Sequence, residues 1–137
     1  MTVVFDSNIW ISALRFGGIP MAALSSAFVH HTIASCDEIE SEVVRALNAK
    51  FGWDSANAAK IMNGYLDGSL RVQITGSLQD VCRDANDDMV LECALVAGAA
   101  HIVSGDKDLL SLKSYSGISI LTAREYLDQF GKAPSLP

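Results

Sequence analysis

The sequence lacks a long hydrophobic run. No apolar stretch reaches the roughly 18 residues that a membrane-spanning helix needs, and no basic segment precedes a long apolar one at the start. We therefore expect a soluble, cytoplasmic protein without a membrane partner. Repeats, low-complexity tracts and linkers are also missing, so the 137 residues, half of them apolar, predict one domain over 1–131 and a short frayed tail at 132–137.

Cysteine and positive charge are scarce. The three cysteines, Cys36, Cys82 and Cys93, are an odd number at spacings that match no zinc-binding pattern. We interpret them as free thiols on small, buried or half-buried side chains. The 10 basic and 16 acidic residues give a net charge of −6, which argues against a broad nucleic-acid-binding surface. A phosphate-bearing substrate would therefore need local positive charge or metal ions.

Apolar runs and turn formers alternate in the order expected for a parallel sheet. Strands are predicted at residues 2–6, 31–35, 70–75, 101–104 and 118–121, and helices at 8–15, 20–29, 37–50, 55–66, 87–97, 107–110 and 122–130. Most of these strands are separated by a helix. The predicted fold is an α/β, three-layer α/β/α sandwich with a central, mostly parallel five-stranded sheet and right-handed crossovers.

Two predicted strands run into an aspartate. Asp6 follows TVVF and Asp106 follows HIVSG, so parallel neighbouring strands would bring both carboxylates to the C-terminal edge of the sheet, where ligands bind in open α/β folds. Asp87 at a helix start and a glutamate from the helix at 37–50 complete a set of four acids. Because close carboxylates repel each other, such a set indicates a hard divalent cation between them.

Each aspartate of this set also has a simpler interpretation. Asp6 in the segment DSN fits an Asx turn. Asp87 fits an ordinary helix N-cap, since aspartate is among the preferred capping residues. Asp106 fits a turn former that caps the short helix after it. The chemical interpretation therefore depends on whether the three aspartates converge.

Other acidic residues lie close in sequence to the members of this set. Asp84, Asp88 and Asp108 are interpreted as caps or solvated turn residues. The glutamate is not settled by periodicity, because the apolar stripe of its helix places Glu40 nearer the centre than Glu42.

The segments VVFDSNIWISAL, DEIESEVVRAL and DANDDMVLECALVAGAAHIVSGDKDLL together resemble the PIN-domain ribonucleases, and in particular the bacterial toxins of toxin–antitoxin pairs. The resemblance covers nearly the whole chain. Asp6, Ser7 and Asn8 match the opening motif of the family, Asp87 matches its third acid, and SGD matches its TGD or TRD at Asp106.

The second acid of the family follows a serine by six residues. Placing Cys36 at that serine position selects Glu42 over Glu40. Ser7 and Ser104 stand where threonine is commoner, which keeps the hydroxyl group. No acid of the family pattern is missing.

The resemblance implies a metal-dependent ribonuclease. Asp6, Asp87 and Asp106 would be the principal ligands of Mg²⁺ or Mn²⁺, and Glu42 a ligand, a water holder or a general base. A bound metal lowers the pKa of a water molecule and neutralises charge on the phosphate. RNA would be the substrate, and the resemblance implies a cognate antitoxin as a partner.

Other side chains are assigned around this centre. Ser7, Asn8 and Ser104 are expected to orient the ligands. Arg15, at the end of the first helix, and Lys107, beside Asp106, are the candidate phosphate contacts.

Histidines and tryptophans are not assigned to the chemistry. His30, His31 and His101 lie at strand entrances, which places them at the opposite edge of the sheet from the acids. Trp10 and Trp53 are interpreted as core or interface residues, although base stacking is an alternative. With the apolar segment PMAALSSAFV, the two tryptophans motivate the expectation of a homodimer.

Two other functions remain as alternatives. A haloacid-dehalogenase-type phosphatase also opens with a strand and DxD, but here Asn8 stands where the second acid is needed, and no acid lies four residues after Asp106. The second alternative is a non-catalytic PIN-like module that works by docking a partner, which a metal-dependent nuclease assay would distinguish.

Overall fold

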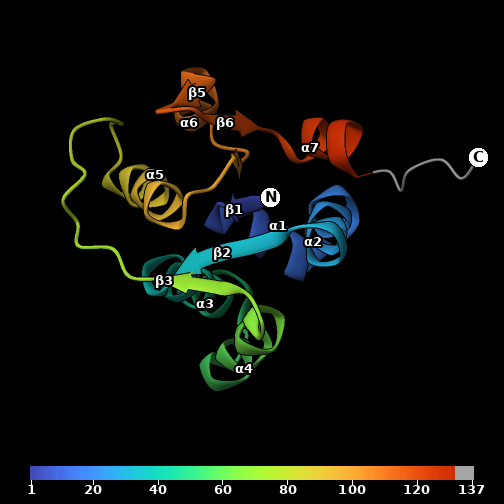
Figure 1. Cartoon of the computed structure of the whole chain (residues 1–137). Coiled ribbons are helices and arrows are strands. Elements are labelled where there is room, and N and C mark those ends of the chain that lie inside the picture. Colours follow the sequence, from blue (N-terminus) through green and yellow to red (C-terminus); the bar gives the residue numbers. More distant parts are fainter. Residues whose placement is uncertain (132–137) are drawn as a thin grey trace, which may run out of the picture.

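A six-stranded sheet forms the centre of the protein in a computed structural model, which describes residues 1–131 (Figure 1). The strands lie in the order β3-β2-β1-β4-β6-β5, and neighbours run parallel except β5 and β6. The predicted mostly parallel α/β sheet is confirmed, while the predicted tail at 132–137 lies outside the described residues. The bounds are β1 Thr2–Phe5, β2 Thr32–Cys36, β3 Leu70–Val72, β4 His101–Val103, β5 Ser114–Tyr115 and β6 Ile118–Leu121.

The expected count of five strands is corrected to six by β5. This strand has two residues and is too short to produce an alternating pattern. Ser116 and Gly117, with φ of 48° and 81°, form the tight turn through which β5 pairs antiparallel with β6. Both residues adopt the left-handed backbone that two-residue hairpin turns require.

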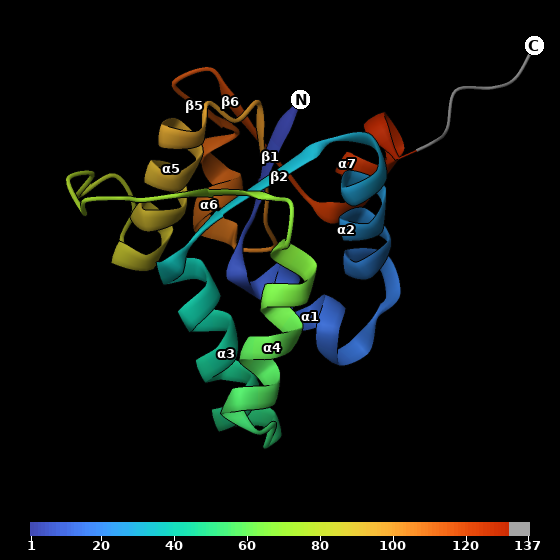
Figure 2. The same ribbon diagram turned by 60° about the horizontal axis from the view of Figure 1, so that its bottom comes forward.

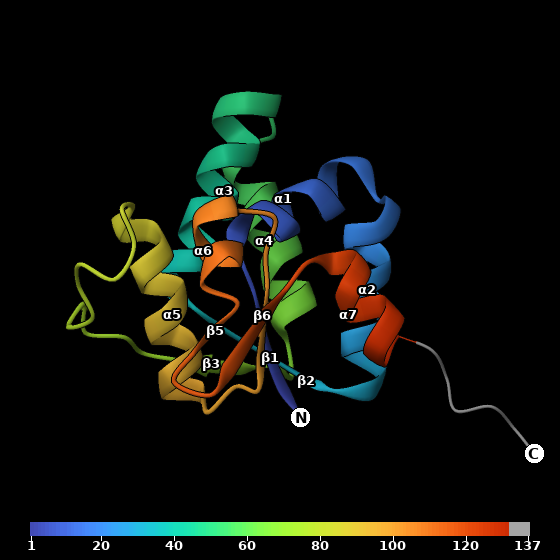
Figure 3. The same cartoon turned by 90° about the horizontal axis from the view of Figure 1, so that it is seen from above.

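Seven helices surround the sheet within residues 1–131. Helix α5 packs on one face, and α2 and α7 lie on the other, which is the predicted three-layer arrangement (Figure 3). Helices α3 and α4 lie side by side and extend beyond the sheet at the end where β2 leads into α3 (Figure 2). The bounds are α1 Ser7–Phe16, α2 Gly18–His30, α3 Asp37–Phe51, α4 Ser55–Leu66, α5 Ala85–Ala97, α6 Lys107–Leu112 and α7 Ala123–Phe130.

Two differences from the predicted boundaries affect the candidate site. Helix α5 begins at Ala85, two residues earlier than predicted, because Asp84 is its N-cap. Strand β3 ends at Val72, and residues 73–84 contain no helix or strand. Several backbone N–H groups of this loop bond to a side chain of α5 and not to a neighbouring strand. Most other predicted ends differ by one or two residues.

The core contains the apolar central strands and one tryptophan. Val4 of β1 and Ile102 of β4 are fully buried. Trp10 on α1 is also fully buried and contacts Phe5 edge-on, with ring centroids 6.5 Å apart. The core interpretation of Trp10 therefore holds, and its use as an exposed base-stacking or dimer residue is wrong. Trp53 is half-buried.

The three cysteines behave as predicted. All are free thiols, with Cys36 and Cys93 buried and Cys82 half-buried.

The N-terminal edge of the sheet carries aromatic contacts. His31 precedes β2 and His101 begins β4, and both rings lie against Phe130 of α7, at 6.1 and 4.8 Å between centroids. His30 ends α2 and contacts His31. As expected, the histidines lie at the opposite end of the strands from the aspartates.

Helices α1 and α2 are separated by a sharp bend. Gly17 joins them with φ of 72° and ψ of −124°, a conformation that glycine adopts without steric cost. Among residues 1–131, no single helix is long and apolar enough to span a membrane; α1 and α2 pass that test only together, as a pair bent by 110°.

Candidate active site

Asp6 lies at the junction of β1 and α1, in the middle of the sheet. Its backbone N–H donates to the carbonyl of Val103 at 2.9 Å, which ties the ends of β1 and β4 together. The carboxylate is buried, with 5% of the residue exposed. Burial raises the pKa of Asp6, and the charges of Glu42 and Asp106 raise it further. The structure thus brings Asp6 and Asp106 together, as the strand pattern predicts, and Glu42 also lies near Asp6.

Ser104 connects two of the aspartates. Its buried hydroxyl donates to Oδ2 of Asp6 at 2.7 Å and accepts from the backbone N–H of Asp106 at 3.0 Å. The Oδ1 atom of Asp106 accepts from the N–H groups of Asp108 and Leu109, at 2.8 and 3.3 Å. Asp106 thus caps α6 and also faces the other acids. Its interpretation as a helix cap and its interpretation as a member of the acid set are therefore compatible.

Asp87 is placed by the first turn of α5. Asp84 caps the helix by accepting from the N–H of Asn86 at 2.9 Å, so the capping interpretation is wrong for Asp87 and confirmed for Asp84. Only 5% of Asp87 is exposed, and within residues 1–131 its buried Oδ2 atom has no hydrogen-bond partner. Burial, followed by the charges of Asp106 and Asp6, raises the pKa of Asp87 to about 7.

Three carboxylates lie close enough to share one cation. One oxygen each from Asp87, Asp106 and Asp108 lies within 4.8 Å of the other two. Oxygen ligands suit Mg²⁺ and Mn²⁺, and the unpartnered oxygen of Asp87 is an atom that a cation would satisfy, so the residues fit a hard divalent ion. We call these three residues the acidic cluster. Asp6 adjoins it through Ser104.

Asp108 was not among the residues predicted to form the site. The sequence predicts a cap or a solvated turn residue at this position, whereas in the structure its carboxylate belongs to the acidic cluster. Its spacing of two residues from Asp106 was the available signal. Asp88 is also not a solvated turn residue, because it is buried and accepts from the N–H of Cys82 at 2.7 Å.

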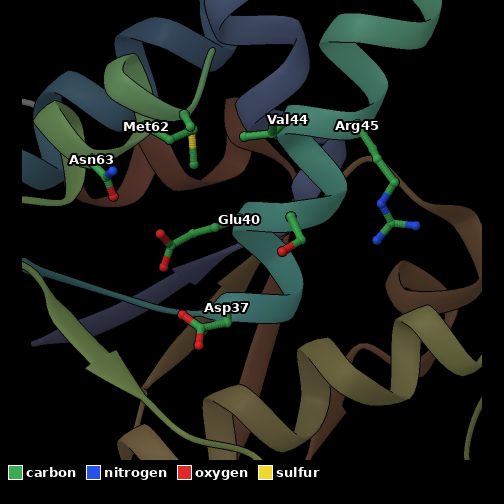
Figure 4. A pocket seen from close by; sticks show the side chains of 8 residues that line it. Asp37, Glu40, Val44, Arg45, Met62 and Asn63 are labelled. Atoms are coloured by element: carbon green, nitrogen blue, oxygen red, sulfur yellow. The ribbon is translucent and has the colours of Figure 1, made fainter. Parts of the chain in front are cut away.

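The two glutamates of α3 have different surroundings. The hydroxyl of Ser7 donates to Oε1 of Glu42 at 2.9 Å and lies 3.4 Å from Oδ1 of Asp6, so Glu42 faces the acids. Glu40 forms an ion pair with Arg71 at 3.2 Å. It points into a groove of about 520 Å³ between α3 and α4 (Figure 4). The structure thus brings Glu42, and not Glu40, next to Asp6.

The other residues predicted for the site are Asn8, Lys107 and Arg15. The Oδ1 atom of Asn8 accepts from the N–H of Gly105 at 3.5 Å, and so orients the chain before Asp106. Lys107 is exposed beside Asp106. Arg15 lies at the far end of α1 from Asp6, over the ring of Phe51 at 5.2 Å, so the structure does not bring it to the site.

A curated relative and a solved structure are similar to this chain. An uncharacterized protein of Methanocaldococcus jannaschii is 28% identical over 95% of this chain and 92% of its own length. The crystal structure of VapBC2 from Rickettsia felis, bound to a DNA fragment from their promoter, contains a chain with the same fold at a TM-score of 0.62. That match has 14% identity and covers 88% of this chain and 97% of the other.

Residues 2–108 of the chain match the family model of the PIN domain. PIN domains are generally nucleases and typically use divalent metal ions. The matched segment contains every acid of the predicted site, and so the chain belongs to the PIN-domain family.

Proposed function

We propose that the protein is a Mg²⁺- or Mn²⁺-dependent endoribonuclease that hydrolyses phosphodiester bonds of single-stranded or structured RNA. The observation that carries this proposal is the buried oxygen of Asp87 without a partner, within 4.8 Å of oxygens of Asp106 and Asp108. Burying an uncompensated carboxylate costs stability unless a cation binds it. Membership of a family of nucleases supports the reaction class.

Each residue has a role in this reaction. The acidic cluster and Asp6 would hold the metal, which supplies a water of lowered pKa and neutralises charge on the phosphate. Ser104 fixes Asp6 relative to Asp106, and Ser7 fixes Glu42 relative to Asp6. Glu42 is then placed to hold the attacking water or to accept its proton.

The proposal is tested by assaying RNA cleavage with and without Mn²⁺. We expect purified Asp6→Ala to lose metal-dependent cleavage and to keep its fold or become more stable, because one carboxylate fewer relieves repulsion. Asp128→Ala, at an exposed position of α7, is the control and should cleave like the wild type. Full activity of Asp6→Ala would refute the assignment, and a wild type that binds metal but never cleaves RNA would favour the non-catalytic binding module.

An antitoxin is the partner that we propose for this nuclease. An apolar groove of about 540 Å³ lies between α1, α2 and α4, and an amphipathic antitoxin helix would bury its apolar face there. The shared fold with a chain of VapBC2 supports this partner. Its lining residues are Leu14, Met21, Trp53, Ile61, Gly64 and Tyr65.

A homodimer and a cytoplasmic location complete the proposal. Helix α2 leaves Val29 76% exposed and Phe28 38% exposed, which favours burial against a second copy. Light scattering that gives one protomer's mass across the micromolar range would refute the dimer. Because RNA is the proposed substrate, we expect the protein in the cytoplasm.

A further inference from the structure

Arg83 reaches the rim of the acidic cluster from the long loop between β3 and α5, which bows outward in Figure 1. Its Nη2 atom donates to Oδ1 of Asp108 at 2.7 Å. The side chain is otherwise open to solvent, at 87% exposure, whereas that of Asp108 is 35% exposed. Within residues 1–131, no other ion pair involves the acidic cluster. A cation site and an arginine therefore share one carboxylate.

Buried carboxylates of α5 hold the loop that carries Arg83. Glu92 accepts from the N–H groups of Thr75, Gly76 and Leu78, at 2.7, 3.3 and 3.1 Å. Asp88, one helical turn earlier, accepts from the N–H of Cys82 at 2.7 Å.

The backbone is thus fixed immediately before Arg83, and the capping contact of Asp84 fixes it immediately after. An exposed ion pair between freely moving groups contributes little to stability. The backbone contacts on both sides of Arg83 therefore hold its position more firmly than the ion pair with Asp108 would by itself.

We propose that Arg83 is an exchangeable cation that pairs with Asp108 in the metal-free site and binds an RNA phosphate next to the scissile one once the metal takes Asp108. This inference rests on the proposed ribonuclease function. The guanidinium fork matches two phosphate oxygens, and a protein of net charge −6 needs such local positive charge to hold RNA. A hollow of about 440 Å³ beside Arg83, lined by Leu78, Asn86 and Met89 among others, has room for the adjoining nucleotide.

If Arg83 exchanges between Asp108 and an RNA phosphate, its removal should change the affinities for Mn²⁺ and for RNA in opposite directions. Arg83→Ala removes a positive charge that competes for Asp108, so the affinity for Mn²⁺ should rise about 2- to 5-fold. The same change removes a phosphate contact, so RNA affinity should fall about 5- to 10-fold. The salt dependence of log K for single-stranded RNA should become shallower by about 0.7. A role limited to holding the loop would not give these opposite shifts.

The experiment combines calorimetric Mn²⁺ titration with fluorescence anisotropy of a labelled single-stranded RNA, measured with Ca²⁺ over a KCl series. Arg83→Lys keeps the charge and should restore the salt slope but only part of the affinity. Arg71→Ala removes the ion pair between Arg71 and Glu40 and is the matched control. It should leave the affinities for Mn²⁺ and for RNA unchanged. Thermal unfolding checks that each variant is folded.

The outcomes separate this inference from the nuclease proposal. If wild type cleaves RNA but Arg83→Ala binds Mn²⁺ and RNA like wild type, the role of Arg83 is overturned and the nuclease proposal stands. Weaker Mn²⁺ binding by folded Arg83→Ala also overturns it. If the opposite shifts occur in a protein that never cleaves RNA, the nuclease proposal fails and the exchange of Arg83 is supported.

Discussion

Helix α5 carries two kinds of buried carboxylate that differ in how their charge is compensated. Asp88 and Glu92 are 4% and 5% exposed, and both accept backbone N–H groups from the loop at 73–84. Asp87 is equally buried, but one of its oxygens has no partner within residues 1–131. Burial alone therefore does not distinguish the three acids of α5, whereas the buried oxygen without a partner distinguishes Asp87 from Asp88 and Glu92.

The pKa values of Glu92 and Asp87 are shifted in opposite directions, in line with this difference in compensation. The hydrogen bond from Leu78, together with those from Thr75 and Gly76, holds the pKa of Glu92 below its ordinary value. Burial and neighbouring acids raise the pKa of Asp87 to about 7. Glu92 thus stabilises the fold through its charge, whereas the charged form of Asp87 is disfavoured in the metal-free protein and would be stabilised by a bound metal.

The largest expected effect comes from neutralising the uncompensated acid. Asp87→Asn should lower metal-dependent RNA cleavage at least about 100-fold, because a ligand is lost, while the protein remains folded. Cleavage rates with saturating Mn²⁺, alongside circular dichroism, measure this. Near-normal cleavage would remove the distinction between Asp87 and its compensated neighbours.

Neutralising a compensated acid should affect the fold instead. Glu92→Gln weakens the bonds to three backbone N–H groups and should lower the free energy of unfolding by about 1–3 kcal/mol. Urea unfolding against Asp128→Asn, an exposed control on α7, tests this. Equal midpoints for the two variants would mean that the loop does not depend on Glu92.

The pH dependence of stability should also separate the two kinds of acid. The pKa of Asp87 is about 7 in the folded protein against an ordinary value of 3.8 for aspartate, so the folded state binds more protons between these pH values. The metal-free protein should therefore lose stability as pH rises from about 4 to about 7. Glu92, with its lowered pKa, contributes stability that is lost as pH falls below its ordinary range.

Thermal unfolding in EDTA across this pH range measures the effect. In Asp87→Asn, stability should fall less between pH 4 and 7 than it does in the wild type. Mn²⁺ added at pH 8 should raise the stability of the wild-type protein again. A wild-type curve that rises through this range would contradict the raised pKa.

The smallest expected effect distinguishes the two glutamates of α3. Glu42→Gln should weaken Mn²⁺ binding by less than about 10-fold, since Glu42 adjoins Asp6 through Ser7. Glu40→Gln should leave Mn²⁺ binding nearly unchanged, because Glu40 pairs with Arg71. Calorimetric titration of both variants gives the ranking, and the reverse order would place Glu40 in the metal site.

Local patterns in the sequence determined the elements and the edge at which the acids gather. Buried β-branched runs predict parallel strands, and an aspartate within a few residues of the end of such a run is expected at the carboxyl end of the sheet. Asp6 and Asp106 were therefore identifiable without the structure. Strand β5 was not, because two residues produce no periodicity.

Tertiary structure alone decided which acids lack compensation. The segment DANDD offers three aspartates, and the start of α5 at Ala85 makes Asp84 a cap, Asp88 an anchor for Cys82 and Asp87 a member of the acidic cluster. Likewise, helical periodicity on α3 did not decide between Glu40 and Glu42. The resemblance to the PIN domain favoured Glu42, and the contacts with Arg71 and Ser7 separate the two glutamates. The neighbours of Asp87, Glu40 and Glu42 come from distant parts of the chain, so their surroundings depend on long-range packing that local sequence patterns do not contain.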